Sequence, residues 1–195
     1  MAKIFTMVLA GGKGERLNPL TEQRAKPAVP FGGKYRIIDF TLSNCLNSGL
    51  RQMAVLIQYK SHSLDRHIRT GWNILNAELG EYIVSVPPQQ RISEEWYRGT
   101  ADAVYQNLFL LDNDHPEFLL VLAGDHIYKM NYADMYNLLI EKQADAVVGA
   151  IETPLADGTR SAWVMKAEEK GSDVNLASHL VNDAHLGRFE AAAVV

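Results

Sequence analysis

Apolar residues are distributed along residues 1–152 in two alternating patterns. Short, nearly continuous apolar runs, typical of strands covered on both faces, occupy residues 4–10, 51–58, 82–86, 118–123 and 144–151. Apolar stripes with helical spacing separate them at 35–48, 62–70, 101–111 and after residue 131. Because strands alternate with helices, the pattern predicts βαβ units and an α/β domain with a mostly parallel central sheet.

Residues suited to helix ends support these boundaries. Ser61, Thr100 and Asn131 stand at the starts of three predicted helices, where a side-chain oxygen can accept a hydrogen bond from a free backbone N–H. Gly49 and Gly71 follow the last residues of two helical stripes, where glycine often ends a helix. The sequence therefore predicts capped helices at these places.

The segment 18–34 is expected to be a long loop, because its prolines are incompatible with regular helix. Long loops in compact domains are usually functional. This one is interpreted as a basic flap over a neighbouring site or, alternatively, as a solvated loop with ordinary surface cations. The cations are Arg24, Lys26 and Lys34.

The pattern weakens after Pro154, where charged and small residues dominate. Residues 1–152 are expected to form the main part of the domain, and residues 153–195 a divergent or truncated continuation of it. The apolar run 191–195 has no terminator and is interpreted as a truncated or degraded ending.

Composition and charge narrow the function classes. A chain of 195 residues with 47% hydrophobic and 22% charged residues is sufficient for one globular domain. The net charge of −4 argues against general nucleic-acid binding. The single cysteine, Cys45, cannot form an internal disulfide, and the apolar N-terminal run is too short to span a membrane. We therefore expect a cytoplasmic protein with no membrane or nucleic-acid partner.

A glycine-rich loop follows the first predicted strand and is the principal candidate for binding an anion. Gly11, Gly12 and Gly14 allow a ligand to approach the backbone closely, and Lys13 and Arg16 add positive charge. The loop lacks the Gly-Lys-Ser/Thr of a P-loop, and Leu17 stands where a dinucleotide-binding fingerprint requires glycine. The alternatives are a phosphate loop of a different kind and a tight turn with solvated cations.

Asp125 is the most informative acidic residue. It follows the most apolar run, 118–123, and should reach the same edge of a parallel sheet as the glycine loop. A carboxylate there is suited to hold Mg²⁺, and Gly124 would allow the metal and phosphates to approach. Alternatively, Asp125 caps a turn or the next helix.

A third cluster occupies residues 96–103. Gly99 and Thr100 are small and precede a helix, so a flat base can lie over them. Trp96 and Tyr97 are large and carry a polar atom, although aromatic residues of this kind belong to a core more often than to a ligand site. A nucleotide, a metal and a phosphate-bearing second substrate together suggest nucleotidyl transfer.

Four sequence blocks also resemble those of a known family. They are LAGGKGERL at 9–17, RAKPAVPFGGKYRIIDF at 24–40, WYRGTADA at 96–103 and LAGDHIY at 122–128. Together they resemble the sugar-nucleotide pyrophosphorylases and, among these, the glucose-1-phosphate adenylyltransferase (ADP-glucose pyrophosphorylase) family, over residues 4–152.

The resemblance implies a Rossmann-like nucleotidyltransferase domain with helices on both faces of its sheet. The implied reaction converts ATP and glucose 1-phosphate to ADP-glucose and pyrophosphate with Mg²⁺, in glycogen or starch synthesis. By the same resemblance, family members are homo-tetramers controlled by sugar-phosphate or nucleotide effectors. They carry a C-terminal β-helix domain, which we do not expect within these 195 residues.

The resemblance also implies roles for individual residues. The triphosphate is assigned to Gly11, Gly12, Gly14 and Arg16, with Arg16 and Asp125 catalytic and Asp125 the metal ligand. The adenine is assigned to Gln90, Gly99 and Thr100, and the glucose 1-phosphate side to Tyr97. Effector binding is assigned to Lys26, and transmission of activation to Gln58 and Trp96.

The C-terminal part of the chain departs from the family pattern. Ser178, His179 and Leu180 replace a Glu-Lys-Pro motif that grips glucose 1-phosphate, and a second metal-binding aspartate would lie beyond Val195. A non-catalytic homologue or fragment that binds nucleotide therefore remains an alternative, as does a relative acting on another sugar phosphate. We expect this chain to bind ATP–Mg²⁺ but to make ADP-glucose poorly or not at all.

Overall fold

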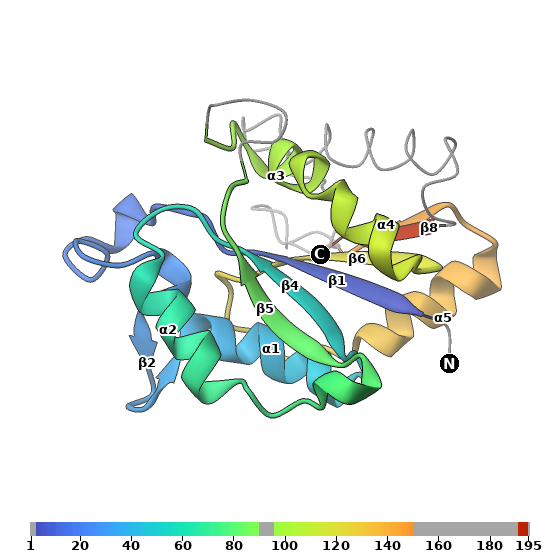
Figure 1. Cartoon of the computed structure of the whole chain (residues 1–195), viewed down its shortest axis with the longest axis horizontal. Coiled ribbons are helices and arrows are strands. Elements are labelled where there is room, and N and C mark those ends of the chain that lie inside the picture. Colours follow the sequence, from blue (N-terminus) through green and yellow to red (C-terminus); the bar gives the residue numbers. More distant parts are fainter. Residues whose placement is uncertain (1–2, 90–95, 150–190, 195) are drawn as a thin grey trace, which may run out of the picture.

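A computed structural model describes residues 3–89, 96–149 and 191–194 of the chain. Its centre is a six-stranded sheet with the strand order β5-β4-β1-β6-β8-β7 (Figure 1). The strands are β1 (Ile4–Leu9), β4 (Gln52–Leu56), β5 (Tyr82–Val86), β6 (Phe118–Ala123), β7 (Ala146–Val148) and β8 (Ala191–Val194). Every neighbouring pair in this sheet is parallel, which confirms the predicted α/β fold.

Helices cover both faces of the sheet, as expected for a Rossmann-like domain (Figure 1). One face carries α1 (Ile37–Asn47), α2 (His62–Gly71) and α5 (Tyr132–Lys142). The other carries α3 (Thr100–Gln106), the 3-10 turn η4 (Leu108–Leu110) and α4 (Leu111–Asp114). Side chains of β1 alternate between the two layers, with Val8 in the first core and Phe5 and Met7 in the second. Burial on both faces explains why the sequences of β1 and β6 are nearly continuous apolar runs.

The predicted helix 35–48 begins later than expected. Tyr35–Arg36 forms a short strand, β3, that pairs antiparallel with β2 (Pro30–Phe31). Gly32 and Gly33 turn the chain between them with positive φ angles of 60° and 88°. The segment 18–34 otherwise contains no helix beyond the 3-10 turn η2 (Lys26–Ala28), which confirms that its prolines exclude regular helix.

The predicted helix 101–111 is divided into α3, η4 and α4, and Asn107 explains the break. Its side-chain Nδ2 donates to the carbonyl oxygen of Ala103, 2.7 Å away, while its backbone N–H donates to Val104 rather than to the residue four positions back. Side-chain bonds to a preceding carbonyl compete with the helical ladder and bend helices. An asparagine inside an apolar stripe therefore interrupts the helix.

The predicted helix caps are correct in part. The Asn131 side chain accepts a hydrogen bond from the backbone N–H of Ala133, at 3.2 Å, and caps α5 as predicted. The caps assigned to Ser61 and Thr100 are wrong. Ser61 has a helical backbone and makes no capping bond, and Thr100 is the first helical residue, after Gly99.

Residues 191–194, part of the apolar run expected to be a truncated or degraded ending, belong to the sheet. They form β8, which lies between β6 and β7 and pairs in parallel with both. Residues 150–190 lie outside the described residues, as does the end of the predicted strand 144–151. Among the described helices, none combines the length and hydropathy needed to cross a membrane.

Candidate functional site

The carboxyl ends of the three central strands bring the predicted site residues together. Leu9, at the end of β1, pairs with Leu56 of β4 on one side and with Ala123 of β6 on the other. The glycine loop, Gln58 and Asp125 therefore leave the sheet at the same edge. This is the arrangement that the sequence predicted for the glycine loop and Asp125.

The glycine loop is packed against the turn η2. Gly14 has a φ of +69°, and a Cβ atom added there would lie 2.7 Å from the Cβ of Lys26. The Gly14 carbonyl accepts a hydrogen bond from the Thr21 hydroxyl at 2.9 Å, and the Gly12 carbonyl accepts one from the Lys26 backbone N–H at 3.3 Å. The loop and the segment 18–34 thus hold each other in place.

An ion pair crosses the edge of the sheet beside this loop. Lys26 Nζ lies 2.9 Å from Asp125 Oδ2, and both side chains are about a quarter exposed, at 27% and 28%. A Cβ atom at Gly12 would lie 3.9 Å from the same carboxylate oxygen. His126 Nε2 is 3.4 Å from the other oxygen, Oδ1. Lys26 is therefore in contact with the predicted metal ligand, a position that sequence reasoning did not give it.

Gly124 has a different role from the one expected. A Cβ atom there would lie 2.9 Å from Val8 Cγ1 and 3.2 Å from the Leu9 carbonyl oxygen. Glycine is needed because β1 passes directly beside it, so the expectation that Gly124 makes room for a metal is not required to explain this residue.

The surroundings of Asp125 are compatible with a divalent metal held jointly by protein and ligand. The described residues contain no group of three His, Cys, Asp or Glu side chains that could hold an ion by themselves. Mg²⁺ is usually bound by one or two carboxylates together with substrate phosphates and waters. Asp125 beside a glycine loop that can present backbone N–H groups to phosphates fits that requirement.

On the other side of the glycine loop, neutral hydrogen bonds hold Tyr97. Gln58 Nε2 donates to the Tyr97 carbonyl at 3.3 Å, and Asn107 Nδ2 donates to the Tyr97 hydroxyl at 2.9 Å. A Cβ atom at Gly11 would lie 3.0 Å from the Cβ of Gln58, so Gln58 links the glycine loop to Tyr97. Trp96 is 59% exposed and lies outside the core.

The other residues that the sequence predicted for the site are Arg16, Gly99, Thr100 and Gln90. Arg16 lies in the 3-10 turn η1 (Glu15–Leu17) and is exposed. Gly99 has an extended backbone just before α3, and Thr100 begins that helix. Gln90 and the departing motif at 178–180 lie outside the described residues.

Two features of the site were missed by the sequence analysis. Tyr59 lies between two cations, with Lys13 Nζ 5.8 Å and Lys60 Nζ 4.9 Å from its ring centroid. Asn107, which holds Tyr97, is 1% exposed. Asn107 could have been found in the sequence because it is a polar residue inside an apolar helical stripe. A polar side chain at such a position usually has a specific hydrogen-bond partner.

Three arginines gather near the start of α1. Burial lowers the pKa of the Arg36 guanidinium, and the nearby charges of Arg24 and Arg66 lower it further, whereas Asp39 opposes them. Arg36 also donates to the backbone carbonyl and hydroxyl of Ser63, at 2.9 and 2.8 Å. This concentration of positive charge is suited to an anionic ligand.

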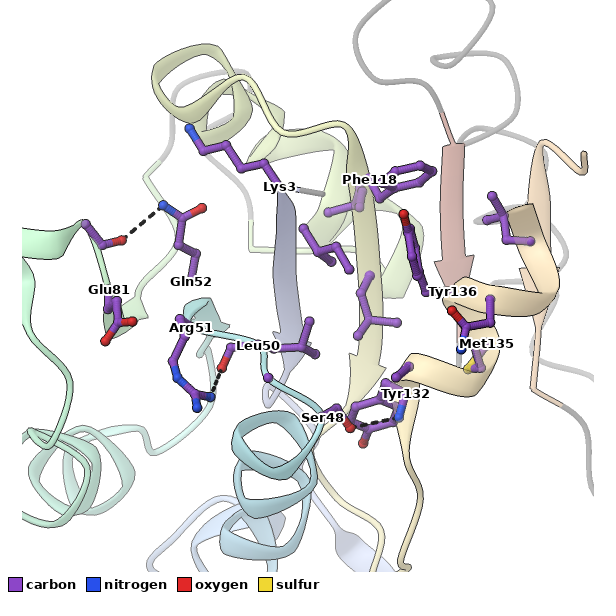
Figure 2. Close-up of a pocket in the computed structure, with 18 of the residues that line it drawn as sticks. Lys3, Ser48, Leu50, Arg51, Gln52, Glu81, Phe118, Tyr132, Met135 and Tyr136 are labelled. Carbon is purple, nitrogen blue, oxygen red and sulfur yellow. Dashed lines mark hydrogen bonds between the residues drawn. The ribbon is translucent and has the colours of Figure 1, made fainter. Parts of the chain in front are cut away.

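The opposite edge of the sheet contains a cavity of about 630 Å³ (Figure 2). It lies at the amino ends of β1, β4 and β6, away from the glycine loop. Its apolar lining includes Ile4, Leu50, Phe118, Leu120, Met135 and Leu139.

Several polar groups around this cavity have partners within the chain. Gln52 donates to the Gly80 carbonyl at 3.0 Å, and Ser48 Oγ accepts from the Tyr132 backbone N–H at 2.8 Å (Figure 2). Arg51 donates to two backbone carbonyls. The lining of the cavity is therefore mainly apolar, and several of its polar groups are already bonded within the chain.

Comparison with known proteins shows the family of the chain. Residues 5–174 match the nucleotidyl transferase family. Glucose-1-phosphate adenylyltransferase 2 of Vibrio parahaemolyticus is 57% identical over 171 residues, covering 88% of this chain and 42% of the relative. The glucose-1-phosphate adenylyltransferase of Methylococcus capsulatus is 61% identical over 153 residues, covering 78% of this chain and 36% of the relative.

These relatives confirm the resemblance that the four sequence blocks indicated. The chain spans less than half the length of each of them. The match to the family covers most of the chain and includes the glycine loop, Lys26 and Asp125. The chain belongs to the nucleotidyl transferase family.

Proposed function

We propose that this chain supplies the nucleotide-binding part of an enzyme that makes ADP-glucose and pyrophosphate from ATP and glucose 1-phosphate. The observation that carries the proposal is the meeting of the glycine loop, Lys26 and Asp125 at one edge of the sheet. The relatives named glucose-1-phosphate adenylyltransferase support the choice of substrates. Such an enzyme serves glycogen or starch synthesis.

In the proposed reaction, a phosphate oxygen of glucose 1-phosphate attacks the α-phosphorus of ATP. The new P–O bond forms as the bond between the α-phosphorus and its bridging oxygen breaks, and that oxygen leaves with pyrophosphate. The protein contributes positioning and neutralisation of charge rather than covalent chemistry.

Nucleotidyl transferases generally use a divalent metal, and we infer that it is Mg²⁺ held by Asp125. When bound, the ion neutralises charge on the triphosphate. Gly11, Gly12 and Gly14 offer backbone N–H groups to the phosphates, and Arg16 stabilises the charge that develops on pyrophosphate.

Lys26 was assigned to an effector through the resemblance, but its contact with Asp125 supports a role at the reaction centre. Lysine is a frequent phosphate ligand, and Lys26 needs only to exchange the carboxylate for a phosphate oxygen. Gln90, Gly99 and Thr100 remain proposed adenine contacts, and Tyr97 a proposed contact of the sugar phosphate.

Regulation and assembly are proposed by analogy with the family. The arginines around Arg36 make a suitable binding place for a sugar-phosphate or nucleotide effector, because such effectors are anionic. Gln58 joins the glycine loop to the segment of Trp96 and Tyr97, which is consistent with transmission of a signal between them. We also propose that the whole protein is a homo-tetramer and that it is located in the cytoplasm.

A second candidate function is nucleotide binding without catalysis. The replacement of Glu-Lys-Pro by Ser178, His179 and Leu180 favours it, because neutral side chains bind phosphate less strongly than lysine. This alternative keeps the nucleotide site but predicts no transfer.

One experiment tests both candidates. The purified chain is titrated with ATP and Mg²⁺ by calorimetry and assayed for pyrophosphate release with glucose 1-phosphate, with UTP and galactose 1-phosphate as matched controls. Pyrophosphate release that needs ATP and glucose 1-phosphate supports the enzyme. Binding of ATP without release supports the second candidate, and absence of ATP binding contradicts both.

A further inference from the structure

The backbone and the side chain of Tyr97 are held by three residues from two elements. Gln58 holds its carbonyl and Asn107 its hydroxyl, while Asp102 Oδ2 accepts the backbone N–H of the next residue, Arg98, at 2.9 Å. Both Asp102 and Asn107 lie on or directly after α3. A half-buried tyrosine held in this way has a defined ring direction.

The orientation of the Asn107 amide follows from its neighbours. The carbonyl oxygen of Ala103 can only accept a hydrogen bond, so the amide atom 2.7 Å from it must be Nδ2. The second hydrogen of Nδ2 then goes to the Tyr97 oxygen, 2.9 Å away. The opposite assignment would set two acceptors against each other.

This orientation leaves Asn107 Oδ1 buried without a hydrogen-bond partner among the described residues. Leaving a buried acceptor unpaired is unfavourable, and such groups in native proteins call for an explanation. Holding the Tyr97 hydroxyl is the explanation that the contacts offer.

The Tyr97 oxygen accepts from Asn107, so its own proton is directed elsewhere. Burial raises the pKa of this phenol, while the bond from Asn107 opposes the rise in part, so the hydroxyl stays protonated at neutral pH. Within the described part of the chain, no recorded hydrogen bond uses this proton. The hydroxyl is thus prepared to donate to an oxygen of a ligand.

We propose that Asn107 is a positioning residue that makes the Tyr97 hydroxyl a donor to an oxygen of the glucosyl group of the sugar phosphate. The inference deepens the proposed function and rests on it, because the resemblance assigns Tyr97 to the sugar phosphate. The inference adds the residue Asn107 and the direction of two hydrogen bonds. Asn107 donates to the Tyr97 hydroxyl, and that hydroxyl donates to the glucosyl group.

The test compares two ligands that differ only in the glucosyl group. Dissociation constants for ADP-glucose and for ADP, each with Mg²⁺, are measured by calorimetry on the whole chain, so the readout does not depend on turnover. The variants are Tyr97→Phe, Asn107→Leu and the double variant. Tyr105→Phe is the matched control, because Tyr105 is an exposed tyrosine of α3, two residues before Asn107.

Tyr97→Phe should weaken ADP-glucose binding roughly five- to tenfold, the value of one hydrogen bond, with ADP affinity unchanged. Asn107→Leu should have a similar effect, and it should add nothing in the Tyr97→Phe background. Tyr105→Phe should leave both affinities unchanged. Circular dichroism and thermal unfolding establish that each variant is folded.

Asn107→Asp provides a second variant of the same size if Asn107→Leu does not fold. Its carboxylate accepts the phenol proton and turns it inward, so ADP-glucose binding should weaken while ADP binding remains. An unchanged ADP-glucose affinity in Tyr97→Phe overturns the inference alone, as do additive losses in the double variant. Absence of ADP-glucose binding by the unmodified chain overturns the proposed function with it.

Discussion

The two edges of the central sheet differ in what they offer a ligand. The amino edge has a cavity with a mainly apolar lining, where the side chains of Gln52 and Arg51 are bonded within the chain. At the carboxyl edge, the glycine loop runs beside charged groups, and the Lys26–Asp125 pair remains partly exposed. We therefore place the candidate site at the carboxyl edge, where charged groups and a glycine loop are available to a ligand, rather than at the cavity.

The largest expected effect is at the carboxyl edge. Asp125→Asn removes the proposed metal ligand and should reduce metal-dependent ATP binding or turnover roughly a hundredfold or more, with folding intact. Asp112→Asn, at an exposed position of α4, is the matched control. Calorimetry with ATP in the presence of Mg²⁺ measures the difference, and an Asp125→Asn variant that binds like the unmodified chain would show that the metal lies elsewhere.

The second effect concerns the charge that develops as pyrophosphate leaves. If the chain turns over, Arg16→Ala should lower kcat roughly tenfold to a hundredfold and raise KM for ATP much less, because the lost contact is strongest in the transition state. Steady-state kinetics separate the two constants. A change in KM alone would indicate that Arg16 binds only the ground state.

The third effect is on the shape of the glycine loop. Gly14→Ala introduces a Cβ at a φ of +69° and 2.7 Å from the Cβ of Lys26, so ATP affinity should fall roughly fivefold or more. Gly33→Ala is a matched control, because its φ is +88° but no atom lies within 4 Å of the added Cβ. Both variants should lose about 1–2 kcal/mol of unfolding free energy, whereas only the first should lose ATP affinity. Equal ATP affinities would contradict this role for the loop.

The smallest effect on ligand binding is expected at the amino edge. Tyr136 packs edge-to-face on Phe118, with ring centroids 5.1 Å apart, and lines the cavity. Tyr136→Ala should lower the free energy of unfolding by about 2–4 kcal/mol and change ATP affinity less than twofold. Denaturant unfolding and calorimetry give the two quantities. A large loss of ATP affinity in a folded Tyr136→Ala variant would show that the amino edge also contributes to ATP binding.

The central strands could be predicted from the sequence because both of their faces are buried, which leaves a nearly continuous apolar run at 4–9 and an unbroken one at 118–123. Parallel pairing then fixes Asp125 beside the glycine loop. The ends of helices were predicted less well. The break at Asn107 depends on a side-chain hydrogen bond to Ala103 that competes with the backbone hydrogen bonds of the helix. The spacing of the apolar residues gives no indication of this bond.

The contacts between distant segments could not be predicted from local pattern. Lys26 and Asp125 are 99 residues apart, and their pairing depends on how the segment 18–34 folds back over the sheet. Gly124 is a second example, because the atom nearest to a Cβ added there belongs to Val8, which lies on another strand. The roles inferred for Arg16, Gln90 and Thr100 came from the resemblance and remain predictions.

The Lys26–Asp125 ion pair has a consequence for the order in which ligands enter. A free divalent cation must compete with an ammonium group already 2.9 Å from the carboxylate, so the cation alone should bind weakly. A nucleotide that arrives with its metal brings a new partner for each member of the pair, a cation for Asp125 and a phosphate for Lys26. Metal and nucleotide should therefore bind with positive coupling, each raising the affinity for the other by the same factor.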